Sequence, residues 1–147
     1  MQEIYPYFIK FHVIFSVLFL LIAVGVSVHS FIGWYYKKKY TNFVKKLRYV
    51  FLFFLYTDLI LGVILYFFLQ KPNELITAKQ AMKFSELRFW AVQHFSNMVF
   101  VVILSHIGSV FIKKATDNNK KFKYSFIYFG ISTLIILISV GVFALRK

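Results

Sequence analysis

Cysteine and charged residues are scarce in this sequence, and each scarcity excludes a class of protein. The 147-residue chain contains no cysteine. That absence excludes a disulfide scaffold, a Cys-ligated zinc finger, an iron–sulfur protein and a c-type haem attached through a C-x-x-C-H motif. Charged residues make up 16% of the chain, whereas soluble domains contain about 25%. Because 60% of the residues are hydrophobic, these few charges cannot cover a soluble globular protein.

Long apolar runs are what the sequence has in abundance. It contains 20 Phe and 10 Tyr, and its mean hydropathy is +0.70. Four runs reach the length of about 20 residues that is needed to cross the hydrocarbon core of a bilayer. They cover about 7–36, 49–69, 89–112 and 122–145, and none contains a proline that would interrupt a helix. We therefore predict an all-α membrane protein, in which a single domain over 1–147 forms a bundle of four transmembrane helices.

The long connection 70–88 follows the second predicted helix, which Pro72 ends. Its apolar residues Leu75, Ala78 and Met82 are spaced to lie on one side of a helix. This pattern predicts a short helix on the outer membrane surface. A lid over a substrate site is the alternative for a loop of this length.

The net charge of +13 is concentrated in two of the connections. Their basic residues are Lys37, Lys38, Lys39, Lys45, Lys46 and Arg48 in the first, and Lys113, Lys114, Lys120, Lys121 and Lys123 in the second. Short loops rich in Lys and Arg remain in the cytoplasm, which predicts that both termini lie outside. We expect the loops to contact anionic lipid headgroups. Nucleic-acid binding is not expected, because no soluble face interleaves basic and aromatic residues.

Five ionisable residues fall inside the predicted spans: His12, His29, Asp58, His94 and His106. The four histidines are all those of the chain, and they lie on the first and third predicted helices. An ionisable side chain is costly within a membrane, so each one marks a candidate functional site. The alternative for each histidine is a side chain that is hydrogen-bonded within the bundle or lies at the interface.

His12 and His94 form the stronger candidate pair. Each lies about one and a half turns inside the outer end of its helix, roughly 8–10 Å below the boundary. Two histidines at one depth on different helices can ligate one haem iron from opposite faces. The helix period places small and apolar residues on their faces: Ser16, Phe19, Ala23, Val26 and Ser30 with His12, and Asn97, Met98, Val101, Ser105 and Gly108 with His94. Such faces pack against other helices, so both histidines are expected to point inward.

His29 and His106 form a weaker second pair. His29 lies roughly 100° round its helix from His12, and His106 roughly 120° from His94. Their depths also differ by about 7 Å. One haem is therefore favoured over two, and His29 can instead extend to the inner membrane surface.

Asp58 lies near the middle of the second predicted helix, where a charge costs about 2.5–3.5 kcal/mol. It must therefore be protonated, paired with an inward-facing group such as His106, or set against a wet cavity. A proton relay or a carboxyl at a quinone site is the functional interpretation. The alternative is an Asp that is simply hydrogen-bonded inside the bundle.

Several segments resemble a family of small four-helix bacterial membrane proteins described as cytochrome b-like. They are GWYYKKKY, DLILGVILYF, LRFWAVQH and SHIGSVFIKKATD, and the resemblance extends over nearly the whole chain. The family has an early histidine in its first helix, matched by His12, and one entering its third, matched by His94. Gln93 stands where the family has Glu, and Tyr56 and Asp58 stand where it often has His and Gln. The resemblance implies haem b in the bacterial inner membrane.

The sequence is more loosely similar to the haem-containing protoporphyrinogen oxidase family of bacteria. His12, His94 and His106 match its histidines, whereas Ser96 stands where that family has Lys. Three functions are thus expected: electron transfer by one haem b near the outer leaflet, an enzyme acting on porphyrin or quinol, or a haem-free subunit of a larger membrane complex. Quinone or a respiratory complex is the partner that these functions imply, besides the lipid bilayer.

Overall fold

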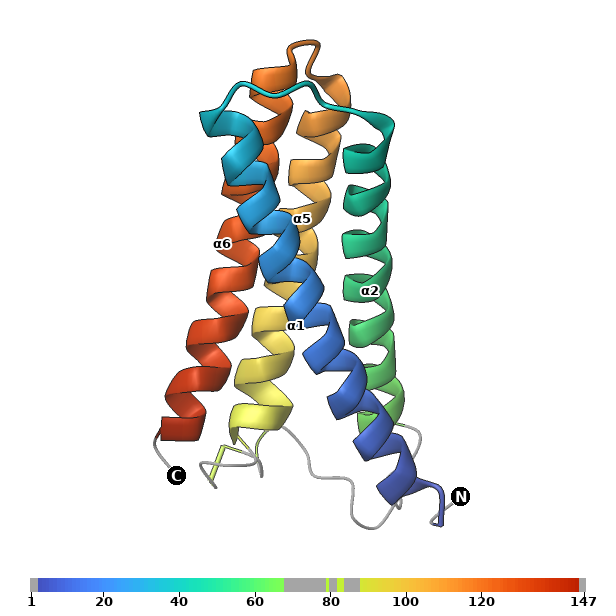
Figure 1. Ribbon diagram of the computed structural model, residues 1–147. Coiled ribbons are helices and arrows are strands. Elements are labelled where there is room, and N and C mark those ends of the chain that lie inside the picture. The colour runs from blue at the N-terminus through green and yellow to red at the C-terminus, as the bar shows by residue number, and fades with distance from the viewer. Residues whose placement is uncertain (1–2, 68–78, 80–81, 84–87, 146–147) are drawn as a thin grey trace.

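The structure is a computed structural model that describes residues 3–67, 79, 82–83 and 88–145. Five helical segments follow one another: α1 (Tyr5–Tyr35), α2 (Asn42–Phe67), the π-helical turn η2 (Phe89–His94), α5 (Phe95–Lys114) and α6 (Asn118–Leu145). Figure 1 shows an antiparallel bundle in which α1 and α5 run one way and α2 and α6 run the other. Each of the four helical rods is long and apolar enough to cross a membrane. The all-α, four-helix prediction is confirmed, and the described residues contain no strand.

Two helices begin earlier than the apolar runs predicted. α2 begins at Asn42 and α6 at Asn118, so their first turns carry lysines that extend beyond the apolar stretch. A helix satisfies its backbone hydrogen bonds whatever its side chains are, so it can continue out of the hydrocarbon into the headgroup region. The predicted surface helix within 70–88 falls mainly on residues outside those that the structure describes.

α1 crosses the bundle from one neighbour to another. Near its N-terminal end, Ser16 is hydrogen-bonded to Asp58 of α2. Near its C-terminal end, Ser30 is hydrogen-bonded to Ser125 of α6, with 2.7 Å between the two hydroxyl oxygens. Figure 1 shows the same crossing: α1 lies against α6 at the upper end and beside α2 at the lower end. Both α1 and α5 pack mainly on α2 and α6. α1 and α5 therefore lie diagonally across the bundle from each other.

The middle of the bundle is filled by aromatic rings and by small residues. Phe51 of α2 stacks on Phe129 of α6 at 4.5 Å between ring centroids and lies 5.5 Å from the ring of Phe19. Across the α5–α6 contact, the hydroxyl of Ser105 donates a hydrogen bond to Ser132. Small residues let membrane helices approach closely, and short hydroxyl groups then bond between them. The predicted inward faces are confirmed, with Phe19, Ala23, Val26 and Ser30 buried on α1 and Met98, Val101, Ser105 and Gly108 buried on α5.

Candidate functional site

Asp58 is buried inside the bundle, with 5% of its surface exposed, and its partners come from α1. The hydroxyl of Ser16 donates a hydrogen bond to Asp58 Oδ1 at 2.6 Å, and Nδ1 of His12 lies 3.3 Å from the same oxygen. His12 and Ser16 are one helical turn apart, so both side chains lie on the same face of α1. The suggested pairing of Asp58 with His106 is wrong. His106 Nδ1 instead lies 2.9 Å from the hydroxyl of Tyr56.

The Ser16 hydroxyl has two acceptors within reach but only one proton. It is 2.6 Å from Asp58 Oδ1 and 2.8 Å from the backbone oxygen of His12. A serine hydroxyl donates only one hydrogen bond at a time. Moving that proton from the backbone oxygen to Asp58 would change how strongly the carboxyl holds His12. The site therefore has two hydrogen-bonding states, in which Ser16 donates either to Asp58 or to the backbone oxygen of His12.

The ring of His12 is held with its two nitrogens in different surroundings. Nδ1 makes a close electrostatic approach to Asp58, although its N–H is not aligned as a hydrogen bond. On the other side of the ring, a Cβ placed on Gly62 would lie 3.8 Å from Cε1 and 3.9 Å from Nε2. Gly62 is one turn after Asp58 on α2, so it leaves room beside Nε2 that a larger side chain would fill. A carboxylate at Nδ1 fixes the tautomer of a histidine and leaves Nε2 as the ligand or the proton acceptor.

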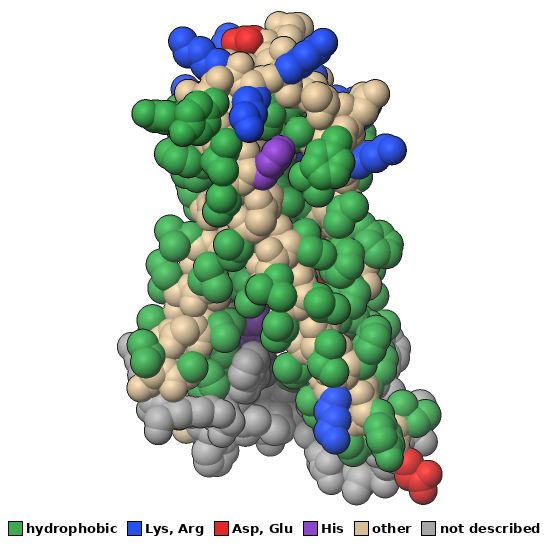
Figure 2. Space-filling model, viewed as in Figure 1, with side chains coloured by type: hydrophobic (Ala, Val, Ile, Leu, Met, Phe, Trp, Pro, Cys, Tyr) green, Lys and Arg blue, Asp and Glu red, His purple; other side chains and the backbone are tan. Residues whose placement is uncertain are grey.

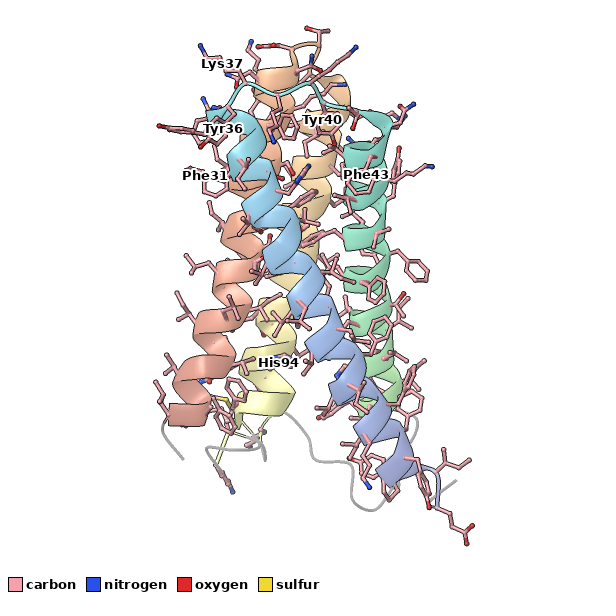
Figure 3. All side chains as sticks on the ribbon, viewed as in Figure 1. Phe31, Tyr36, Lys37, Tyr40, Phe43 and His94 are labelled. Atoms are coloured by element: carbon pink, nitrogen blue, oxygen red, sulfur yellow. The ribbon has the colours of Figure 1, made fainter. Side chains whose placement is uncertain are left out.

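His94 lies where η2 joins α5, on the helix that is diagonal to α1 in the bundle. It is the last residue of η2 and is partly buried, and its ring lies 6.0 Å from that of Phe89, which stacks on Phe143 of α6 at 4.0 Å. Figure 3 labels His94 at the lower end of the rod that begins with η2, which appears between α6 and α1 in this view.

The π-helical turn is a feature that the sequence did not reveal. In such a turn each backbone N–H bonds one residue farther back than in an α-helix, which widens the helix and re-aims the side chains that follow. Turns of this kind are rare, and they occur frequently at functional sites. Phe89–His94 therefore sets the direction of His94 independently of the regular period of α5.

The second predicted pair is not brought together in the described part of the chain. The ring of His29 is half-buried and lies edge-on to Phe43 and Phe122 near the basic end of the bundle. His106 is exposed on the outside of α5, beside Tyr56 of α2. Both residues have ordinary aromatic or hydrogen-bonded neighbours, as the alternative interpretation expected.

The described residues form no site for a bare metal ion. Among the described residues, no three His, Cys, Asp or Glu side chains cluster closely enough to hold a bare metal ion. A haem iron receives four ligands from its porphyrin and needs only one or two from the protein. The comparisons with known proteins do not add to this chemistry: no family model, no curated protein and no solved structure matches the chain.

Proposed function

We propose that this protein binds one haem b and transfers electrons in the bacterial inner membrane. His12 and His94 are its axial ligands, and the haem lies between α1 and α5 near the outer leaflet. The observation that carries this proposal is the His12–Asp58 contact at 3.3 Å. It holds one nitrogen of a histidine inside a bundle, while the other nitrogen lies beside Gly62, which has no side chain.

The chemistry of the site fits haem in two respects. A carboxylate behind a ligating histidine is the usual supporting arrangement, and it makes the ligand more basic. α1 and α5 lie diagonally, so a group held between them would not have to separate a tightly packed helix pair. Haem would supply a one-electron couple at its iron. The chain's own part is to orient His12 through Asp58 and Ser16 and to exclude water with the surrounding rings.

The proposed orientation has both termini outside. Figure 2 shows most of the visible Lys and Arg side chains at the end of the bundle that holds the α1–α2 and α5–α6 connections. Such an excess of positive charge marks the cytoplasmic side. A cysteine at Lys39 should resist an impermeant thiol reagent in intact cells, whereas a cysteine at Glu3 should react with it. Labelling with the reverse pattern would overturn the orientation.

Absorption spectra of the purified protein test the haem proposal. Protein made in haem-replete cells should give the sharp α band of six-coordinate haem b on reduction. His12→Ala and His94→Ala should each remove most of the haem. The matched control is His29→Ala, which deletes a histidine from α1 outside the proposed site and should leave the haem content unchanged. A colourless wild-type protein would overturn the proposal and favour the haem-free subunit.

A second candidate is an enzyme that moves protons while oxidising a quinol or a porphyrinogen. The contacts of Asp58 favour it, because Ser16 is hydrogen-bonded to this carboxyl and Nδ1 of His12 lies 3.3 Å from the same oxygen, so two titratable groups meet inside the bundle. Asp58→Asn preserves the shape of the side chain and removes the titrating group. The enzyme is supported if the wild type turns over either substrate and Asp58→Asn folds normally but does not. Absence of turnover by the wild type would exclude it.

A further inference from the structure

Arg48 is a buried cation at the basic end of the bundle. The sequence groups it with the lysines of the first connection, but α2 begins at Asn42, and only 4% of the Arg48 surface is exposed. Its Nε is buried and has no hydrogen-bond partner. The only pair of oppositely charged groups within 4 Å among the described residues is His12–Asp58, so no described carboxylate neutralises Arg48. A buried guanidinium without a counter-ion is unfavourable, and it creates a strong preference for an anion.

A second polar group beside Arg48 has no acceptor for its proton. The hydroxyl of Tyr40, on the connection between α1 and α2, is buried, and its neighbour Arg48 can only donate hydrogen bonds, so no group accepts the phenol proton. Burial raises the pKa of Tyr40 and the nearby charge of Arg48 opposes that rise, so the phenol keeps its proton as a donor. Figure 3 labels Tyr40 at this end of the bundle, beneath the connection to which it belongs. The donors of Arg48 and Tyr40 therefore need the same thing, an oxygen that only accepts hydrogen bonds.

Lysines from three helices lie near Tyr40 or near Tyr49, the residue that follows Arg48. Nζ of Lys121, in the first turns of α6, lies 5.3 Å from the centre of the Tyr40 ring. Lys45 of α2 and Lys113 of α5 both lie within electrostatic reach of Tyr49, whose ring is 4.9 Å from the Arg48 guanidinium. Asp117 is the only acid in the two connections and their flanking turns. The electrostatic potential at the end of the bundle that holds the α1–α2 and α5–α6 connections is thus strongly positive.

We propose that Arg48 and Tyr40 form a binding site for the phosphate of an anionic phospholipid headgroup. Arg48 is about 9 Å along α2 from its start, a depth at which headgroup phosphates meet the hydrocarbon. The planar guanidinium matches two phosphate oxygens at once, and a phosphate oxygen also accepts from the Tyr40 hydroxyl. Lys45, Lys113 and Lys121 provide the positive rim. Basic pockets between membrane helices recognise anionic lipids in this way.

Lipid retention measured by native mass spectrometry tests the site. The full-length protein is reconstituted into vesicles of phosphatidylcholine mixed with phosphatidylglycerol and then released into detergent. The wild type should retain phosphatidylglycerol in preference to phosphatidylcholine. Arg48→Gln should retain roughly tenfold less of it, the change expected when a charge-assisted hydrogen bond is lost. Lys46→Gln is the matched control, because it removes an exposed charge from the same turn of α2 and should retain the lipid normally.

Two further arms keep the test decisive if Arg48→Gln does not fold. Arg48→Lys keeps the charge but loses the planar guanidinium. It should therefore retain less phosphatidylglycerol than the wild type and Lys46→Gln, but more than Arg48→Gln. Inorganic phosphate is added to protein in phosphatidylcholine vesicles, and it should not reproduce the thermal stabilisation given by phosphatidylglycerol. Equal retention in the wild type and in each Arg48 variant that folds, or equal stabilisation by inorganic phosphate, would overturn the assignment to a lipid headgroup.

Discussion

The hydrogen bond between Ser16 and Asp58 should contribute measurably to the stability of the α1–α2 contact. The bond is short, at 2.6 Å, and Asp58 is buried, so water does not compete for the carboxyl. Hydrogen bonds between membrane helices contribute about 0.6 kcal/mol on average and about 1.7 kcal/mol at most. The geometry here places the coupling in the upper half of that range, at about 1–1.5 kcal/mol. Ser16→Ala alone should cost less than Asp58→Ala, because Asp58 also holds His12.

A double-mutant cycle measures this coupling directly. The free energy of unfolding is determined in detergent for the wild type, Ser16→Ala, Asp58→Ala and the double variant. The control cycle replaces Tyr56 with Phe and His106 with Ala, because this pair is 2.9 Å apart but exposed on the outside of the bundle. Its coupling should be smaller. A Ser16–Asp58 coupling indistinguishable from zero, with both single variants destabilised, would refute the reasoning that links α1 and α2 through this bond.

Two more predictions concern packing and pH. Gly108→Ala should destabilise the protein by about 1–3 kcal/mol in thermal unfolding, because the new Cβ would collide with the side chain of Tyr128. Gly25→Ala is the control: its new Cβ would meet no atom within 4 Å, so the variant should be as stable as the wild type. Burial raises the pKa of Tyr40, so the folded state holds that proton more tightly; stability should be unaffected below pH 10 and should decline as the pH rises above it. Tyr40→Phe should remove part of this decline, and an identical pH profile for the two proteins would contradict the prediction.

The sequence alone determined the class of the protein and the buried faces of its helices. Apolar runs of spanning length admit only helices or closed barrels in a membrane, and the length of these runs selects helices. The helix period then predicted that Phe19, Val26, Met98 and Val101 face inward, and all four are buried. These properties depend on spacing along a single helix, which is why they could be predicted without the fold.

The partners of the ionisable residues depended on how the helices cross. Ser16 and Asp58 were both predicted to face inward, but their pairing requires α1 to lie against α2 at this depth and against α6 farther along. A different crossing angle with the same faces would have given Asp58 another partner. No pattern within either helix encodes that angle, because it results from the packing of all four helices.

Two other features were decided by the tertiary structure. The π-helical turn at Phe89–His94 changes the direction of His94 within a segment whose composition is typical of an ordinary helix. Arg48 is one of a run of basic residues that predicts an exposed connection, yet the early start of α2 turns it into the bundle. The sequence therefore determined which residues can reach the interior, and the packing of helix against helix determined which of them meet there.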